Sequence, residues 1–339
     1  MDRTKAKTLA TAFVTTLIVG CSHPGSALGP VPLATPLLIE RLDQDLFHSA
    51  GDTTGTLSLK LYALYGEFYR TYVEQILQGA PVNDPRLPLV LASFTNNPDW
   101  STAQQAVDSA LGDMEPQRIQ FTSAFGRLKA LFPDSLTPRI VAFNSGFNYG
   151  IVPTDSVLGI GVEWFIGKDQ PVIKYLAPEN FPQYVKDRMQ PAMLVPSAVK
   201  GWLMVHYTPD IRGADLLTNL VETGKVMALL DALLPDTDPA LKLAFSPAQL
   251  KWCEANAFPM WKELLDKKLL YSKKNDDIAR IMNDAPFTNG FPRESPGHIG
   301  EWIGLQMVKS YLGANPEITL PQLFAMKDAA PILKAYKPR

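Results

Sequence analysis

The sequence predicts an α+β fold that is predominantly helical and contains one small antiparallel sheet. Apolar residues recur at helical spacing in residues 57–77 and 115–132, and helical spacing returns after residue 175. Between these regions, residues 158–164 alternate large apolar side chains with glycine or glutamate, which is typical of a strand. Because the sequence contains no internal repeat and no domain boundary after the N-terminal segment, we expect residues 37–339 to form a single domain.

The first twenty residues have the pattern of a secretory leader. Arg3, Lys5 and Lys7 precede an uncharged run that is shorter than the roughly 20 apolar residues of a spanning helix. The run ends Ile-Val-Gly-Cys at Cys21, a bacterial lipobox, in which the cysteine thiol receives a diacylglyceryl group and the peptidase cuts before it. We expect residues 1–20 to be removed and Cys21 to be lipidated; an ordinary leader with a chance cysteine is the alternative.

The residues after the lipobox indicate a tether and a location. Residues 21–36 carry no charge and are rich in proline and glycine, so they are interpreted as a flexible tether. Cys21 is followed by Ser22 rather than aspartate, which by the sorting rule of Gram-negative bacteria favours the outer membrane. The domain is therefore expected in the cell envelope, lipid-anchored and facing the periplasm.

Charge and cysteine content exclude several classes of protein. The whole chain has 32 basic and 34 acidic residues, and removing residues 1–20, with three basic residues and Asp2, leaves 29 and 33. Without a basic run, nucleic acid is excluded as a partner. If Cys21 is lipidated, Cys253 has no cysteine to pair with, and its apolar neighbours predict a buried, inert thiol.

The N-terminal third is predicted to be helical. A short amphipathic helix is expected within residues 38–47, with Asp43 and Asp45 on its solvent side. Longer helices are expected over residues 57–77 and 115–132, each with an apolar face and each ended by a proline-containing segment.

The middle of the chain is predicted to contain two strands. Residues 140–149 are rich in β-branched and aromatic side chains, and residues 158–164 alternate. Residues 150–155 between them have the length of a hairpin connection, so the two strands are expected to be antiparallel.

The second half is predicted to be helical again. Helices are expected over residues 196–207 and 215–234, and a capping box at residues 246–249 opens another. The helix expected over residues 299–311 carries two glycines, which lower helix propensity and indicate a close approach to a neighbouring helix.

No catalytic motif is present in the sequence: it lacks His-Glu-x-x-His, Gly-x-Ser-x-Gly, a phosphate loop and a dinucleotide-binding turn. His48 is interpreted as solvated, His206 as a satisfied core residue, and His298 as a residue that caps a helix start. A zinc site built from the last two histidines with Glu222 is conceivable, but neither histidine has a partner at the i, i+4 spacing. We therefore expect a domain that folds without metal, binds no cofactor and is not an enzyme.

Polar residues in otherwise apolar segments are the candidates for a binding groove. Asn144, Asn148 and Glu163 interrupt the predicted strands, and Glu222 and Lys225 flank a glycine in the middle of a helix. The favoured alternative places the last two on the solvent face of that helix.

Five short segments follow one another behind the lipobox. They are IERLDQDLF (39–47), FNY (147–149), LGIGVEWFIG (158–167), LVETGKVM (220–227) with LLP (233–235), and GEWIGLQMVKSY (300–311). In this order they resemble the gliding motility lipoprotein family GldB of Bacteroidota, over residues 39 to about 327. The resemblance implies an envelope lipoprotein that acts with the gliding and type IX secretion machinery, and it implies no known enzymatic activity.

The family in turn resembles a group of predicted zinc peptidases. Their strand pair is followed by a helix with His-Glu-x-x-His, a helix with Glu-Gly and a helix with Gly-x-x-x-Gly. This sequence keeps features of the last two, but the helix over residues 196–207 lacks the zinc motif. The resemblance therefore implies a zincin-like pseudo-peptidase scaffold whose cleft binds an extended peptide against the strand over residues 157–165.

The groove beside this strand is the predicted working surface. Two glycines and a glutamate occupy the strand face opposite the packed one and leave its backbone uncovered. The candidate groove residues are Asn148, Gly159, Gly161, Glu163, His206, Glu222 and Lys225. The alternative is that the glycines admit a neighbouring helix, such as the one that starts at Ile299.

Two hypotheses for function follow. The leading one is a non-catalytic envelope lipoprotein that supports the gliding and type IX secretion machinery through contacts with other envelope proteins. The rival is a hydrolase with a non-standard site around His206, Glu222 and Glu163. A periplasmic small-molecule binding protein is a third class, but the repeated α/β pattern of that class is missing.

The lipobox generates the first testable prediction. A Cys21→Ala variant cannot be acylated, so it is expected to accumulate as an uncleaved precursor and to leave the lipid-anchored fraction. Precursor size and membrane fractionation measure both effects. Unchanged processing together with unchanged membrane partition would contradict the assignment.

Overall fold

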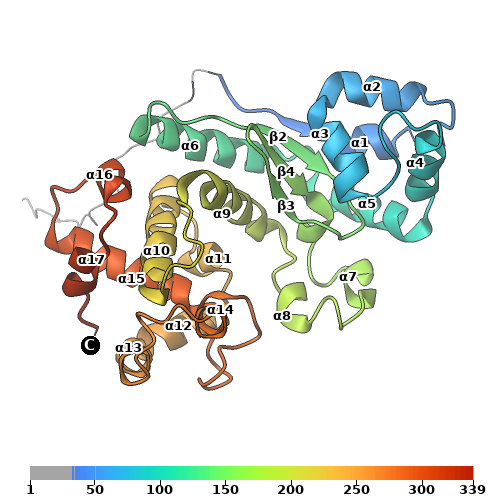
Figure 1. Cartoon of the computed structure of the whole chain (residues 1–339). Helices are drawn as coiled ribbons and strands as arrows, with labels where there is room; N and C mark the ends of the chain where they lie inside the picture. Colours follow the sequence, from blue (N-terminus) through green and yellow to red (C-terminus); the bar gives the residue numbers. More distant parts are fainter. Residues whose placement is uncertain (1–32, 34, 50, 339) are drawn as a thin grey trace, which may run out of the picture.

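The computed structural model describes residue 33, residues 35–49 and residues 51–338. The predicted leader (1–20), Cys21 and most of the predicted tether (21–36) lie outside this range, so the division of the chain into leader, tether and domain stays a prediction. Helices dominate the described part, which contains one small sheet (Figure 1). Among the described residues, none of the helices combines the length and the apolar character that a membrane span requires.

The sheet is mixed, with strand order β1-β2-β4-β3. Its strands are β1 (Ile39–Arg41), β2 (Arg139–Phe143), β3 (Ile151–Pro153) and β4 (Val157–Gly161). β1, β2 and β4 are parallel, and β3 is antiparallel to β4. The expected antiparallel sheet is therefore wrong: the segment taken as a connection contains β3, which reverses the chain direction, so that β2 and β4 run the same way.

Helices precede and follow the sheet. The N-terminal elements are α1 (Leu42–Phe47), α2 (Thr56–Tyr65), α3 (Glu67–Thr71), the π-helical turn η1 (Tyr72–Ile76), α4 (Leu87–Thr95), α5 (Pro98–Leu111) and α6 (Glu115–Leu131). Those after β4 are η2 (Val162–Phe165), α7 (Pro171–Tyr175), α8 (Gln183–Lys186), η3 (Pro191–Met193), α9 (Leu194–Tyr207), α10 (Leu216–Leu233), α11 (Pro239–Leu243), α12 (Pro247–Ala255), α13 (Ala257–Asp266), α14 (Asn275–Met282), α15 (Ile299–Ala314), α16 (Leu320–Ala325) and α17 (Ala330–Ala335).

Most helices with strong local signals lie where the sequence predicts them. α6, α9, α10 and α15 match the expected ranges within a few residues. The Asp215 side chain accepts a hydrogen bond from Thr218 N (2.9 Å) at the start of α10, and the capping box of Ser246 and Gln249 opens α12.

Two N-terminal expectations are wrong. The helix expected over residues 57–77 is interrupted at Gly66, whose φ of 57° is left-handed and ends α2. The helix expected from residue 38 begins at Leu42, because the residues before it pair with β2 as a strand.

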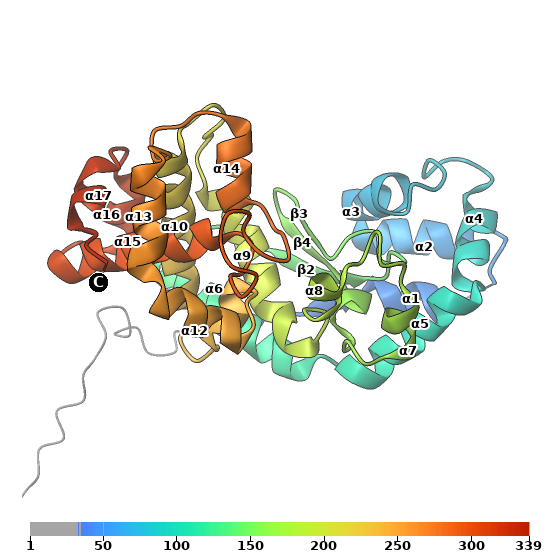
Figure 2. The ribbon, with the colours of Figure 1, turned by 90° about the horizontal axis from the view of Figure 1, so that it is seen from below.

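Both faces of the sheet are covered (Figure 2). Val141, Phe143 and Val157 belong to a core formed with α1, α2, α3 and η1. The alternate residues of the same strands belong to a larger core with α6, α9 and α10. All five residues of β4 are buried, so the expectation of one open face on the strand over residues 157–165 is wrong; parallel strands are normally covered on both sides.

The two strand glycines admit neighbours from this chain. A Cβ atom at Gly159 would lie 2.6 Å from a ring carbon of Phe68, and one at Gly161 would lie 2.0 Å from the Tyr149 carbonyl oxygen. Neither glycine opens onto a groove, and neither makes its closest contact with the helix that starts at Ile299. The expected open groove is therefore wrong, whereas the alternative is correct for Gly159: it admits a neighbouring helix, α3, through Phe68, and not the helix that starts at Ile299.

The glycines of α15 do mark a close helix approach. A Cβ atom at Gly224 of α10 would lie 2.2 Å from the Gly304 carbonyl oxygen, and one at Gly304 would lie 2.0 Å from the Leu220 carbonyl oxygen. The backbones of α10 and α15 therefore touch, with no space for a side chain on either helix at the crossing.

This crossing yields a matched pair of variants. Gly304→Ala is expected to lower the free energy of unfolding by about 1–3 kcal/mol or more, because the added methyl group overlaps the α10 backbone. Gly313→Ala, on the same helix, is expected to raise it by up to about 1 kcal/mol, because a Cβ there meets no described atom within 4 Å. Chemical denaturation measures both, and equal effects would contradict the packing argument.

Candidate functional site

Buried polar side chains gather where the three parallel strands end. Asp43 follows β1, Asn144 and Ser145 follow β2, and Glu163 follows β4. Because the carboxyl ends of parallel strands share one edge of a sheet, these residues lie on the same side of the molecule. Each of the four is at most 1% exposed.

Glu163 holds the loop that follows β2. Its Oε1 atom accepts hydrogen bonds from the Ser145 backbone N–H (2.8 Å), the Ser145 hydroxyl (2.6 Å) and the Phe147 backbone N–H (3.1 Å). The Ser145 oxygen in turn accepts from the backbone N–H groups of Asn148 and Tyr149, each at 3.1 Å. One buried carboxyl group thus organises the backbone of residues 145–149.

The same loop contains unusual backbone angles. Gly146 and Phe147 both have a φ of 65°, in the left-handed region that non-glycine residues rarely adopt. The hydrogen bond from the Phe147 N–H to Glu163 stabilises this conformation.

The environment of Glu163 changes its acidity. Burial raises the pKa of its carboxyl group to about 7, although the hydrogen bonds from Ser145 and Phe147 act in the opposite direction. Its second oxygen, Oε2, has no hydrogen-bond partner among the described residues. The carboxyl group therefore changes charge near neutral pH while it holds the loop.

A second set of hydrogen bonds joins this loop to α1, α5 and η1. Asn144 donates to the Gln104 side chain (3.1 Å), and Gln104 donates to Asp43 (2.9 Å). Asp43 also pairs with Arg41 (2.7 Å), while the Tyr72 hydroxyl donates to the Asn144 carbonyl oxygen (2.7 Å). The expected solvent position of Asp43 is wrong, because the helix after β1 turns this side chain toward α5.

Glu222 and Lys225 are buried, so their expected position on a solvent face is wrong. The Lys225 ammonium group lies 2.7 Å from the Glu222 carboxylate and donates to the Met326 carbonyl oxygen (2.7 Å). Because Lys225 is only 2% exposed, the pair ties α10 to the segment after α16 rather than lining a groove.

The histidines lie apart from one another. His206 stacks on Trp202 and has its Nε2 atom 3.0 Å from the Thr154 carbonyl oxygen, so it is satisfied as expected, but it is only half-buried and lies at the margin of the core. His298 is buried with its ring nitrogens 3.0 Å from Asp284 and from the Leu243 carbonyl oxygen. It occupies the N-cap position of α15, as expected, but its side chain makes no capping hydrogen bond there and binds Asp284 and Leu243 instead.

The described residues do not assemble the alternative hydrolase or zinc site. His206 bonds to the turn before β4, whereas Glu163 follows β4 and Glu222 faces Lys225. Within the described ranges, no three histidine, cysteine or acidic side chains are grouped to hold a metal ion. Asn148 lies within the Glu163 loop and is exposed, and its side-chain amide is 3.4 Å from the Ile76 carbonyl oxygen.

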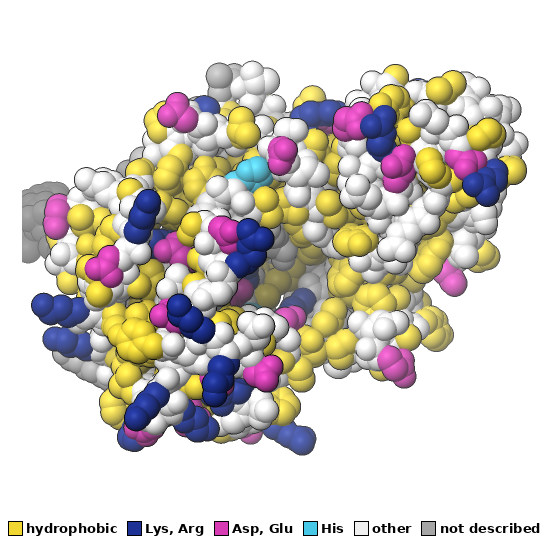
Figure 3. Space-filling view, in the orientation of Figure 1, with side chains coloured by type: hydrophobic (Ala, Val, Ile, Leu, Met, Phe, Trp, Pro, Cys, Tyr) yellow, Lys and Arg dark blue, Asp and Glu magenta, His cyan; other side chains and the backbone are white. Residues whose placement is uncertain are grey.

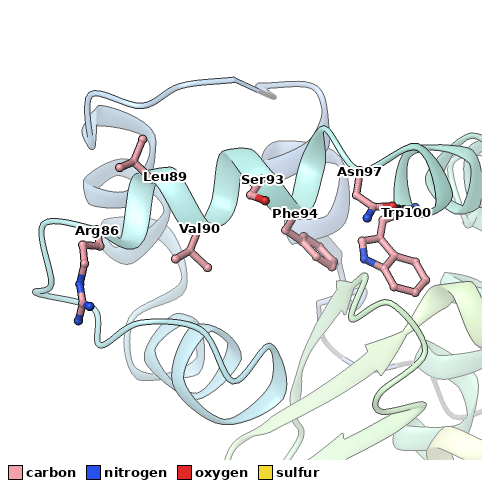
Figure 4. Close-up of a pocket in the computed structure, with 7 residues that line it drawn as sticks. All are labelled: Arg86, Leu89, Val90, Ser93, Phe94, Asn97 and Trp100. Carbon is pink, nitrogen blue, oxygen red and sulfur yellow. Dashed lines mark hydrogen bonds between the residues drawn. The ribbon is translucent and has the colours of Figure 1, made fainter.

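A shallow cleft of about 510 Å³ lies along α4 and the start of α5 (Figure 4). Its lining residues follow helical spacing: Arg86, Leu89, Val90, Ser93, Phe94, Asn97 and Trp100. Sequence reasoning missed this cleft, although the i, i+3, i+4, i+7 spacing over residues 86–97 was a signal that could have found it.

The cleft is joined to the Glu163 loop by aromatic packing. A Cβ atom at Gly146 would lie 3.0 Å from the Trp100 ring, and the rings of Trp100 and Phe147 are 6.3 Å apart. Further pairs continue from Phe147 to Trp164 (6.4 Å) and from Trp164 to Phe181 (5.6 Å). Figure 3 shows hydrophobic side chains gathered over this part of the surface, between the sheet and α7.

These features define a predominantly helical α+β protein built on a small mixed sheet, with an internal polar cluster where the three parallel strands end and a cleft beside it. The model of the family described as gliding motility protein GldB matches residues 32–338, so the chain belongs to this lipoprotein family. The family name implies involvement in gliding motility and association with the cell envelope. Comparison with curated proteins and with solved structures finds no match to the chain.

The pKa of Glu163 generates a prediction about stability. Because this pKa lies above its ordinary value of 4.5, the folded state binds the proton more tightly than the unfolded state. The free energy of unfolding should therefore fall as pH rises from about 4.5 to 7, by up to about 3 kcal/mol. Denaturation at several pH values should show that Glu163→Gln lacks this decrease.

The exposed Glu179 offers a control for the Glu163 measurement. Glu179→Gln is expected to keep the pH dependence of the unmodified protein. If Glu163→Gln also keeps it, the buried carboxyl group does not titrate between these pH values.

Proposed function

We propose that this chain is a non-catalytic envelope lipoprotein that supports the gliding and type IX secretion machinery by binding an apolar segment of another envelope protein in the α4–α5 cleft. The observation that carries the proposal is the cleft itself, where Leu89 is exposed and the side chains of Val90, Phe94 and Trp100 are only partly buried. Lipidation at Cys21 would hold the domain at the outer membrane, facing the periplasm.

The form of the cleft favours a helical segment of a protein over a small ligand. Its lining repeats at i, i+3, i+4 and i+7, so an amphipathic helix laid alongside would meet apolar side chains interspersed with a few polar ones. Leu89, near the Arg86 end of the cleft, is 59% exposed. The Arg86 guanidinium is already bound to the Asp84 carboxylate (2.6 and 3.0 Å), which leaves it poorly placed to orient a small anion.

The state of the reactive side chains supports a non-catalytic role. Ser145 is buried and hydrogen-bonded to Glu163, where substrate does not reach it. Burial raises the pKa of the Cys253 thiol to about 12, so the nucleophilic thiolate is scarce at neutral pH. α9 corresponds to the helix that carries His-Glu-x-x-His in the zinc peptidases that the family resembles, but it contains only one histidine, His206. The proposal therefore includes a pseudo-peptidase scaffold.

Charged or bulky substitutions in the cleft test the proposal. Leu89→Glu and Ser93→Arg replace exposed residues, so the domain should fold and be lipidated normally while the apolar partner is excluded. Surface spreading and secretion in the native host are expected to fall to the level of a gene deletion. The matched control, Leu265→Glu on α13, changes a leucine that is 48% exposed elsewhere and should leave both unaffected.

The outcomes show which surface of the domain the function requires. Normal spreading and secretion in both cleft variants, with normal protein levels, would show that the cleft is not the working surface. Loss of function in the control alone would place the contact on the C-terminal helices instead.

A further inference from the structure

Exposed apolar side chains gather at the amino-terminal edge of the parallel strands, opposite the polar cluster. Leu38 immediately precedes β1 and is 72% exposed, and Leu136 lies three residues before β2 and is 61% exposed. Leu64 near the end of α2 is 50% exposed, and Ile119 in the first half of α6 is 56% exposed.

Hydrogen bonds place Leu64 and Leu38 at the same edge. Ile39 pairs with Ile140, so Leu38 and Arg139 are neighbours at the start of the two strands. The Arg139 guanidinium donates to the Leu64 carbonyl oxygen (3.2 Å), which brings the end of α2 to this point.

Contacts of α6 place Ile119 there as well. The Thr122 hydroxyl oxygen accepts a hydrogen bond from the Leu37 backbone N–H (3.2 Å), and the Arg118 guanidinium reaches the Leu37 carbonyl oxygen (3.5 Å). Ile119 lies on the same helical turn as these two residues. We call Leu38, Leu64, Ile119 and Leu136 the amino-edge patch.

The charges around the amino-edge patch are nearly balanced. Nearby cations include Arg118, which pairs with Glu115, and Arg139, which pairs with Glu40. Lys129 donates to the Ser135 carbonyl oxygen beside Leu136, and Lys60 and Asp134 are exposed close to the patch in sequence. Apolar contact, rather than net charge, is therefore what this surface offers.

The chain itself indicates what covers this patch. The described segment that leads back toward Cys21 runs along the upper side of the molecule in Figure 1, between α6 and α2, and reaches β1 through Leu38. Twelve residue steps separate Cys21 from Leu33, which span at most about 43 Å. A lipid on Cys21 would thus keep this edge close to a bilayer, where a high local concentration makes a weak contact effective.

We propose that the amino-edge patch rests on the surface of the bilayer that holds the lipid anchor, with its apolar side chains inserted among the lipids. This inference depends on lipidation of Cys21, which is part of the proposed function. Because the polar cluster and the adjoining α4–α5 cleft lie toward the opposite edge of the sheet, this orientation turns the cleft away from the membrane and toward partners.

Site-specific fluorophores test the orientation. The full-length lipidated protein is reconstituted into phosphatidylethanolamine–phosphatidylglycerol vesicles that contain brominated lipid, with a single added cysteine as Leu38→Cys, Leu136→Cys or, as control, Leu265→Cys. Cys253 is fully buried, and the unmodified protein measures its background labelling. Fluorophores at the two patch positions are expected to be quenched several-fold more strongly than the fluorophore on α13.

Two readouts distinguish failure of the lipid anchor from failure of the proposed orientation. Flotation of the unmodified protein with the vesicles reports on the anchor alone. Protein that floats but shows equal quenching at the three positions would overturn the orientation and leave the anchor intact. Protein that does not float would overturn the anchor and, with it, the orientation.

Discussion

The buried carboxyl group of Glu163 receives three hydrogen bonds from the loop that connects β2 to β3, and the surface features of this half of the molecule depend on that loop. The loop contains two consecutive residues in left-handed conformations, which need such support. Its Gly146 lies against Trp100, which forms one end of the α4–α5 cleft. An internal polar contact thus supports the loop that packs against one end of an external cleft.

The parallel arrangement of β1, β2 and β4 gives the domain two different ends. At the carboxyl ends, buried polar side chains join α1, α5 and η1 to the sheet. At the amino ends, exposed leucines and an isoleucine lie where the chain departs toward Cys21. The two proposals use these opposite ends, one for a protein partner and one for the membrane, so a single strand direction underlies both.

Local signals in the sequence were enough for much of the helical structure. α6, α10, α12 and α15 depend on apolar periodicity, an N-cap aspartate and a capping box, which are all properties of neighbouring residues. The close helix approach predicted from the glycines of α15 is confirmed at Gly304. This prediction was also local, because glycine lowers helix propensity and is therefore expected in a helix mainly where a neighbour packs closely. The family was also recognised from short segments in order, and the family model matches residues 32–338.

Tertiary structure alone decided strand direction and the burial of charged groups. β3 is three residues long and carries a proline, so its local pattern was too weak to show that it, rather than β2, is the antiparallel partner of β4. Asp43 and Lys225 look solvated in sequence, because their partners Gln104 and Met326 lie 61 and 101 residues away. Helix periodicity and caps act within a few residues of the chain, whereas strand pairing and buried polar contacts depend on residues that only the folded chain brings together.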